Sequence, residues 1–216
     1  MIEVDKKVLN KFLLPALASI FIFIWLSFEL KAKNEIWFDQ FAFIAAKDSI
    51  TFRLFTFVTF FGSKWGIIAV GVVFLTILGW KKNYIAMLVT AVTAVGGGWF
   101  NQWLKELFER ERPLSAGLEE GYSFPSGHAM VGIMFYGFIA YLCHRHIPAM
   151  RNAVYFFIVF IFFLGISRII IGVHYVSDVI AGFTVGYMCL TISILIYEIA
   201  TKRNERSINK GGGVRM

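Results

Sequence analysis

Six long stretches of apolar residues run through this chain of 216 residues and constrain its fold more than any other feature. A helix needs about 20 apolar residues to cross a hydrocarbon core about 30 Å thick, and most of the six approach this length. Hydrophobic residues make up 58% of the sequence and charged residues only 16%, and a soluble core of this size could not bury such a composition. The sequence therefore predicts an all-α fold, a bundle of six transmembrane helices forming one domain over residues 1–200. The predicted spans are Phe12–Phe28, Trp65–Trp80, Tyr84–Leu104, His128–Leu142, Val154–Ile171 and Val176–Ile199.

The stretch before the short second span is apolar as well, but charged residues interrupt it. Lys47, Asp48 and Arg53 fall within it, and Lys64 follows it. A helix with apolar and charged faces lies in the membrane interface more readily than across the bilayer. We therefore interpret Phe38–Phe61 as an interfacial amphipathic helix that leads into the second span.

The distribution of charge predicts how the chain is oriented. A formal net charge of +7 can indicate nucleic-acid binding, but in so apolar a chain it favours a positively charged cytoplasmic membrane face, and we expect no nucleic-acid partner. With six spans, the side that holds both termini has 12 Lys and Arg against 4 Asp and Glu, and the opposite side has 9 against 10. The positive-inside rule then places both termini in the cytoplasm. Residues 201–216 are expected to form a flexible basic cytoplasmic tail near anionic headgroups.

Two basic residues follow the third predicted span on the outer side. Lys105 and Arg112 are seven residues apart, almost two helical turns, so both are expected along one helix face until Pro113 ends the helix. Two cations on one face suit a multiply charged anion such as phosphate. The alternative is that both side chains extend to the interface and are partly neutralised by neighbouring glutamates.

A Ser-Gly-His sequence precedes the fourth predicted span. Backbone N–H groups at a helix N-terminus favour an anion, and Gly127 allows that anion to approach closely. The Ser126 hydroxyl either caps the helix or binds the anion. His128 would stand beside it with a side chain suited to proton transfer. The alternative is an ordinary serine cap with an interfacial histidine.

The connection before the last span holds a further cation, Arg168, and a histidine with a carboxylate one helical turn later. His174 and Asp178 are four residues apart, so Asp178 can accept the ring N–H of His174 and leave the other ring nitrogen free. A basic or nucleophilic imidazole needs that arrangement. Alternatively, His174 and Asp178 only satisfy each other's hydrogen-bonding groups at the membrane boundary and have no catalytic role. Three cations, two histidines and one carboxylate on one membrane face together predict binding and transfer of a phosphate.

At these positions the sequence resembles the type 2 phosphatidic acid phosphatase superfamily of membrane lipid phosphatases. The family signature has three parts: Lys, six residues and Arg-Pro; then Pro-Ser-Gly-His; then Ser-Arg, five residues, His, three residues and Asp. Every position is filled, in order and at the family spacing. The matching residues are Lys105, Arg112, Pro113, Pro125, Ser126, Gly127, His128, Ser167, Arg168, His174 and Asp178. Integral membrane members have six spans with the motifs near the outer membrane face.

The resemblance implies metal-independent hydrolysis of a phosphomonoester or pyrophosphate through a phosphohistidine. In that scheme His174 attacks phosphorus, Asp178 orients its ring, and His128 protonates the leaving oxygen. The phosphoryl oxygens would be held by Lys105, Arg112, Arg168, Ser126 and the N–H of Gly127. No cofactor is expected, because the sequence has no Asp-rich or His-rich set of metal ligands. Its two cysteines, in apolar context, indicate neither a disulfide framework nor a metal site.

A site at the outer membrane face beside apolar helices suits a lipid phosphate. Undecaprenyl pyrophosphate, a substrate of bacterial family members, is favoured because its release outside the cytoplasm fits the predicted topology. The alternatives are phosphatidylglycerophosphate, phosphatidic acid, and a lipid phosphotransferase on the same fold. A non-catalytic phospholipid binder or transporter would need the cations but not His174 with Asp178. The acidic loop Leu114–Gly121, with Glu119 and Glu120, either shapes the entrance or is a solvated turn.

Overall fold

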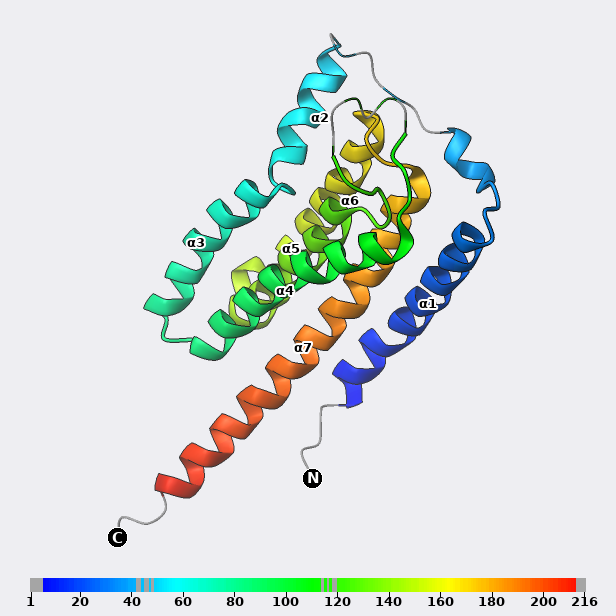
Figure 1. The fold of residues 1–216 in the computed structure, drawn as a ribbon. Helices are drawn as coiled ribbons and strands as arrows, with labels where there is room; N and C mark the ends of the chain where they lie inside the picture. The colour runs from blue at the N-terminus through cyan, green and yellow to red at the C-terminus, as the bar shows by residue number, and fades with distance from the viewer. Residues whose placement is uncertain are drawn as a thin grey trace.

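The described part of the chain folds into a bundle of α-helices, which confirms the predicted all-α class (Figure 1). The computed structural model describes residues 6–41, 44, 47, 49–113, 115, 117 and 120–212. No strand occurs within these residues. The helices are α1 (Lys6–Lys31), α2 (Ile50–Phe60), α3 (Lys64–Trp80), α4 (Tyr84–Phe108), α5 (Gly127–His146), α6 (Ala153–Ile170) and α7 (Val176–Gly212), with short 3-10 helices at η1 (Trp37–Phe41) and η3 (Pro148–Met150).

Five of these helices, α1, α4, α5, α6 and α7, are long and apolar enough to cross a membrane. Helices α2 and α3 meet the same criteria only as a pair, bent by 50° at the break between them. Counting that pair as one span gives six spans, the number that the sequence predicts, but this span then includes α2, which the sequence assigned to the interfacial helix. The break forms because Ser63 caps the start of α3, where its Oγ accepts a hydrogen bond from the Gly66 N–H at 3.2 Å.

The segment predicted as one interfacial helix, Phe38–Phe61, contains two helices among its described residues, and residues 42, 43, 45, 46 and 48 lie outside the described part of the chain. The 3-10 helix η1 ends at Phe41, and α2 begins only at Ile50. Ser49 sets that start, because its Oγ accepts a hydrogen bond from the N–H of Phe52 at 3.1 Å. Helix α2 packs against α6 and so covers one side of the site described below.

The last helix continues beyond its predicted end at Ile199. Residues 201–212, expected to belong to a flexible tail, are helical instead. Helix α7 extends to Gly212. Residues 200–210 include Lys, Arg and Glu, which favour helices, and no proline or glycine. The last two described residues of the helix, Gly211 and Gly212, favour it less.

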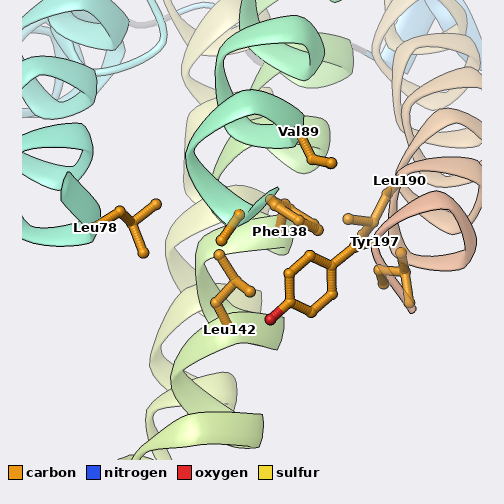
Figure 2. Close-up of a cluster of buried hydrophobic side chains, with 8 residues drawn as sticks. Leu78, Val89, Phe138, Leu142, Leu190 and Tyr197 are labelled. Carbon is orange, nitrogen blue, oxygen red and sulfur yellow. The ribbon is translucent and has the colours of Figure 1, made fainter. Parts of the chain in front are cut away.

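Helix α5 occupies the centre of the bundle and packs against α4, α6 and α7. Figure 2 shows part of this core, where Phe138 and Leu142 of α5 lie near Leu190 and Tyr197 of α7. In Figure 1 the start of α1 and the end of α7 lie at one end of the bundle. The connections from α4 to α5 and from α6 to α7 lie at the opposite end.

Two glycines of α7 bring it close to the start of α5. A Cβ atom at Gly182 would lie 2.6 Å from the carbonyl oxygen of Ser126, and one at Gly186 would lie 2.0 Å from Cγ2 of Ile133. Small residues four apart commonly allow membrane helices to approach in this way. This close packing places the first turns of α5 and α7 side by side.

Candidate active site

The three sequence motifs meet at one end of the bundle, where α4, α5, α6 and α7 begin or end. Lys105 lies in the last turn of α4 and Arg168 in the last turn of α6. His174 lies in the connection from α6 to α7. The backbone N–H of Ser126, just before α5, donates to the carbonyl oxygen of Asp178 at 2.9 Å. Residues up to 73 positions apart in sequence therefore share one site.

His174 and Asp178 form the buried pair that their spacing predicts. Nδ1 of His174 lies 3.2 Å from Oδ2 of Asp178, and the two side chains are 1% and 0% exposed. The same Oδ2 accepts the backbone N–H of Tyr175 at 3.0 Å, which fixes the carboxylate. With the Nδ1 proton held by Asp178, the lone pair of the ring lies on Nε2, where it accepts a long hydrogen bond from Nη1 of Arg112 at 3.4 Å.

The surroundings of His174 keep its imidazole neutral. Burial lowers the pKa of His174 to about 4; the hydrogen bond and charge of Asp178 oppose this shift, while Arg168 and Arg112 add to it. The imidazole therefore stays unprotonated at neutral pH. A neutral ring with an unprotonated Nε2 is the form that can act as a nucleophile.

Arg112 reaches the site by a different route from the predicted one. Helix α4 ends at Phe108, and Glu109 adopts a left-handed conformation with φ of 48°, so the prediction that Lys105 and Arg112 share one helix face is wrong. The N–H of Glu109 donates to the carbonyl oxygen of Lys105 at 2.9 Å and caps the helix. The chain then brings Nη1 of Arg112 to 3.4 Å from Nε2 of His174. Arg112 is held there by its bond to the carbonyl oxygen of Val173 at 2.9 Å.

The start of α5 has the features of an anion site. Ser126 occupies the capping position, yet its side chain makes no cap hydrogen bond. Its Oγ is buried and has no hydrogen-bond partner among the described residues. A buried hydroxyl without a partner is costly, so a ligand oxygen there would satisfy it. A Cβ atom at Gly127 would lie 2.8 Å from Oδ1 of Asn101 and would push aside this side chain, whose Nδ2 donates to the carbonyl oxygen of Pro125 at 3.1 Å.

His128 and Arg168 complete the set that the sequence predicts. His128 lies within electrostatic reach of Lys105, Arg112, Arg168 and His174. Arg168 is only 5% exposed, and its Nη1 donates to Oγ1 of Thr59 in α2 at 3.1 Å. The two histidines thus face a common group of cations.

Sequence reasoning missed a second layer of polar residues behind Asp178. Nη1 of Arg110 lies 2.6 Å from Oδ1 of Asp178, and Nη2 of Arg110 lies 2.8 Å from Oδ2 of Asp39. Ser177 also bonds to Asp39. Asp39 and Arg110 are 71 positions apart, and no local spacing relates them. The only sequence signal is that Arg110 falls inside the first motif, two residues before Arg112.

An apolar cavity of about 630 Å³ opens beside His128, between α3, α4 and α5. Its lining is mostly aliphatic and aromatic and extends from Gly127 and His128 at the site to Leu75 and Phe135. Gly62, at the break between α2 and α3, lies against the His128 ring, since a Cβ atom there would be 2.6 Å from His128 Cδ2. The bend in that helix pair therefore forms one wall of the cavity at the site.

The predicted entrance loop is described only in part. Leu114, Ala116, Leu118 and Glu119 lie outside the described residues. Ser115 donates to the carbonyl oxygen of Gly172 at 2.6 Å, and the carbonyl oxygen of Gly121 accepts a bond from Nε of Arg112 at 3.0 Å. These contacts hold the described part of the loop against the site.

Together, the fold and these side chains define a polytopic membrane protein with a buried His–Asp pair and a cluster of cations at one end of its bundle. The family model of the PAP2 superfamily matches residues 83–202. This match covers more than half of the chain and all three motifs, so the protein belongs to the PAP2 superfamily. The resemblance drawn from the sequence is thereby confirmed.

Known members of similar sequence and structure act on lipid phosphates, as their names state. Phosphatidylglycerophosphatase B of Bacillus subtilis is 43% identical over 94 residues, which are 41% of this chain and 46% of the relative. Lipid A 1-phosphatase of Rhizobium etli is 36% identical over 75 residues, 35% of this chain and 29% of the relative. The matched regions thus span less than half of these relatives. The crystal structure of a transmembrane PAP2-type phosphatidylglycerolphosphate phosphatase from Bacillus subtilis matches over 91% of this chain and 95% of that one, at 25% identity and a TM-score of 0.61.

Proposed function

We propose that the protein is a membrane lipid phosphatase that removes the terminal phosphate of a phosphatidylglycerophosphate-type lipid through a phosphohistidine on His174. One observation carries this proposal: the neutral Nε2 of a buried, Asp178-bound imidazole lies 3.4 Å from the guanidinium of Arg112. A nucleophile beside a phosphate-binding cation is what phosphoryl transfer needs. The sequence alone favoured undecaprenyl pyrophosphate, but no residue supported that preference. The names of the similar proteins favour the alternative, phosphatidylglycerophosphate.

The reaction proceeds in two displacements at phosphorus. Nε2 of His174 forms a bond to phosphorus as the bond from phosphorus to the lipid oxygen breaks, and His128 donates a proton to that oxygen. Water then attacks the phosphohistidine, His128 takes the proton from the water, and the bond from phosphorus to Nε2 breaks. Inorganic phosphate leaves, and both histidines return to their starting protonation states.

The cations stabilise the charge that spreads over the phosphoryl oxygens in each displacement. Lys105, Arg112 and Arg168 supply positive charge, and the unpaired Ser126 hydroxyl and the Gly127 N–H supply hydrogen bonds. Phosphoryl transfer depends chiefly on such positioning and charge stabilisation. These groups do the work that a metal ion does in many other phosphatases.

The apolar cavity beside His128 supports a lipid as the substrate. An acyl chain in the cavity would run along α3, α4 and α5 while its phosphate stays among the cations. A soluble phosphomonoester would leave this apolar surface uncovered and lose the binding free energy of the chain. We therefore expect a lipid phosphate to be hydrolysed far more efficiently than a soluble one.

A phosphate-release assay with purified protein tests the function. The substrates are phosphatidylglycerophosphate, undecaprenyl pyrophosphate, phosphatidic acid and a soluble phosphomonoester, each without added acceptor lipid. We expect the highest kcat/KM with phosphatidylglycerophosphate. A preference for undecaprenyl pyrophosphate would reverse the substrate assignment, and phosphate release only after an acceptor lipid is supplied would identify a phosphotransferase.

Metal independence is a separate expectation of the proposed mechanism. Turnover should persist within about twofold in excess EDTA, because the three cations already neutralise the phosphoryl oxygens. Vanadate should inhibit, since it adopts the five-coordinate geometry of phosphorus in the displacement. A steady-state assay with each reagent measures both effects, and recovery of activity only on adding a divalent ion would contradict the metal-free scheme.

We also propose that both termini lie in the cytoplasm of a bacterial cell and that the site faces outward. The start of α1 and the end of α7 lie together at the end of the bundle opposite the site, which fits the charge distribution. In a background without Cys143 and Cys189, Glu120→Cys near the site should react with an impermeant maleimide in intact cells. The matched Glu205→Cys at the exposed far end of α7 should react only after permeabilisation. The opposite pattern would reverse the orientation.

A further inference from the structure

Arg110 is a cation of the site that lies within the first motif but at none of its defined positions. Its Nη1 lies 2.6 Å from Oδ1 of Asp178, whereas His174 uses the other oxygen, Oδ2, at 3.2 Å. The carboxylate therefore stands between two side-chain partners, each bound to its own oxygen, and Oδ2 also accepts the backbone N–H of Tyr175. The Arg110 side chain is 14% exposed, so solvent screens this pair only weakly.

Asp39 anchors Arg110 from a distant part of the chain. Its Oδ2 lies 2.8 Å from Nη2 of Arg110 and accepts the Ser177 hydroxyl at 2.6 Å. Its Oδ1 accepts the Ser177 backbone N–H at 2.8 Å. The Arg110 guanidinium also lies over the ring of Tyr175, 4.0 Å from its centroid. The short helix η1, which carries Asp39, is thereby tied to the first turn of α7.

These contacts leave Arg110 little capacity to bind substrate. Both of its terminal nitrogens are directed at carboxylates, and one ring face of Tyr175 covers the group. Burial alone would lower the pKa of Arg110, but the charges and hydrogen bonds of Asp178 and Asp39 raise it. The side chain is therefore a fixed cation inside the protein and differs in this respect from Arg112, which reaches His174.

Asp178 needs such a partner because it is completely buried. Its side chain is 0% exposed, and burial disfavours an ionised carboxylate unless charges and hydrogen bonds compensate. A protonated Asp178 would no longer fix the Nδ1 proton of His174. Without Arg110, its Oδ1 would lose its cationic partner, and the carboxylate could also rotate away from the imidazole.

We propose that Arg110 is a positioning residue of the phosphatase reaction: anchored by Asp39, it holds Asp178 ionised and oriented so that His174 presents Nε2 to phosphorus. This inference rests on the proposed role of His174 as the nucleophile. It extends the His–Asp pair to a chain of four side chains, Asp39, Arg110, Asp178 and His174. It also gives the segment between α1 and α2 a function in the site.

The test compares kcat and KM for phosphatidylglycerophosphate in variants of the full-length protein. Arg110→Gln should lower kcat by about 10²-fold to 10³-fold, less than the roughly 10⁴-fold typical of losing the orienting carboxylate itself. KM and the vanadate inhibition constant should stay within about threefold, because the phosphate ligands remain. Arg110→Lys should recover about tenfold in kcat, since one ammonium can pair with Asp178 but cannot reproduce both contacts.

Two further comparisons separate positioning from general stability. In an Asp178→Asn background, adding Arg110→Gln should lower kcat by less than about threefold, because the two residues act as one unit. The matched control is Arg145→Gln, which breaks the bond from Nε of Arg145 to Glu198 (2.9 Å) at the opposite end of the bundle. This control should lower Tm and leave kcat unchanged.

The inference fails if Arg110→Gln lowers Tm as the control does but keeps kcat within threefold of wild type. It also fails if KM and the vanadate inhibition constant rise more than tenfold while kcat is preserved, because Arg110 would then be a phosphate ligand. If Arg110→Gln does not accumulate in membranes, Asp39→Asn applies the same criteria, with an expected fall in kcat of about tenfold. Wild-type turnover by His174→Ala would instead overturn the proposed function itself, on which this inference rests.

Discussion

Replacing His174 with alanine is expected to abolish phosphate release, with a fall in kcat of at least about 10⁴-fold. The reason is that no other imidazole among the described residues bonds to the Asp178 carboxylate. The variant should still insert into the membrane and bind inorganic phosphate, because Lys105, Arg112 and Arg168 are unchanged. Phosphate release from phosphatidylglycerophosphate and a phosphate-binding titration measure the two properties separately.

The matched control for this variant is His144→Ala. His144 is an exposed histidine in the last turn of α5, at the end of the bundle opposite the site. Its loss should leave kcat within about twofold of wild type. If His174→Ala retained wild-type hydrolysis while remaining folded, His174 could not be the nucleophile.

Replacing Asp178 with asparagine should produce the second large loss, about 10³-fold to 10⁴-fold in the chemical step. An asparagine NH₂ group facing Nδ1 would favour the tautomer that has its proton on Nε2, and that nitrogen could not attack phosphorus. Asparagine also removes the negative charge that pairs with Arg110. Single-turnover kinetics isolate the chemical step from product release.

The Asp178→Asn variant requires a check of folding, because it leaves Arg110 with one carboxylate partner instead of two. Thermal melting in detergent should give a lower Tm, because a buried Arg110 guanidinium with only one carboxylate partner lowers the free energy of unfolding. Phosphate binding should persist. A single-turnover rate within tenfold of wild type would show that Asp178 does not orient the nucleophile.

The sequence predicted those parts of the site that depend on local spacing. His174 and Asp178 are four residues apart and bond to each other as predicted, although His174 lies in the connection just before α7. The Ser126 hydroxyl, which the sequence left as either a cap or a ligand, does not cap its helix. The three motifs together also predicted that distant segments of the chain meet. Their cations, histidines and carboxylate suit the binding and transfer of a phosphate only if they lie in one site.

Non-local features escaped the sequence for physical reasons. Helix α4 ends at Phe108 because the next residue, Glu109, adopts a left-handed conformation that glutamate rarely adopts, and no glycine marks this end. The pairing of Arg110 with Asp39 joins segments 71 residues apart, and no periodic pattern relates them. The boundary between α2 and α3, by contrast, falls at Gly62-Ser63-Lys64, where the sequence predicted the interfacial helix to end and the second span to begin.

The central claim is that Nε2 of His174 carries the phosphoryl group during turnover. Wild-type protein mixed with phosphatidylglycerophosphate labelled with ³²P in its terminal phosphate, and quenched in alkali within the first turnover, tests this directly. The account predicts a base-stable, acid-labile phosphoprotein whose label maps to His174 and is absent from His174→Ala. Label on another residue, or rapid phosphate release with no labelled protein at any time, would contradict it.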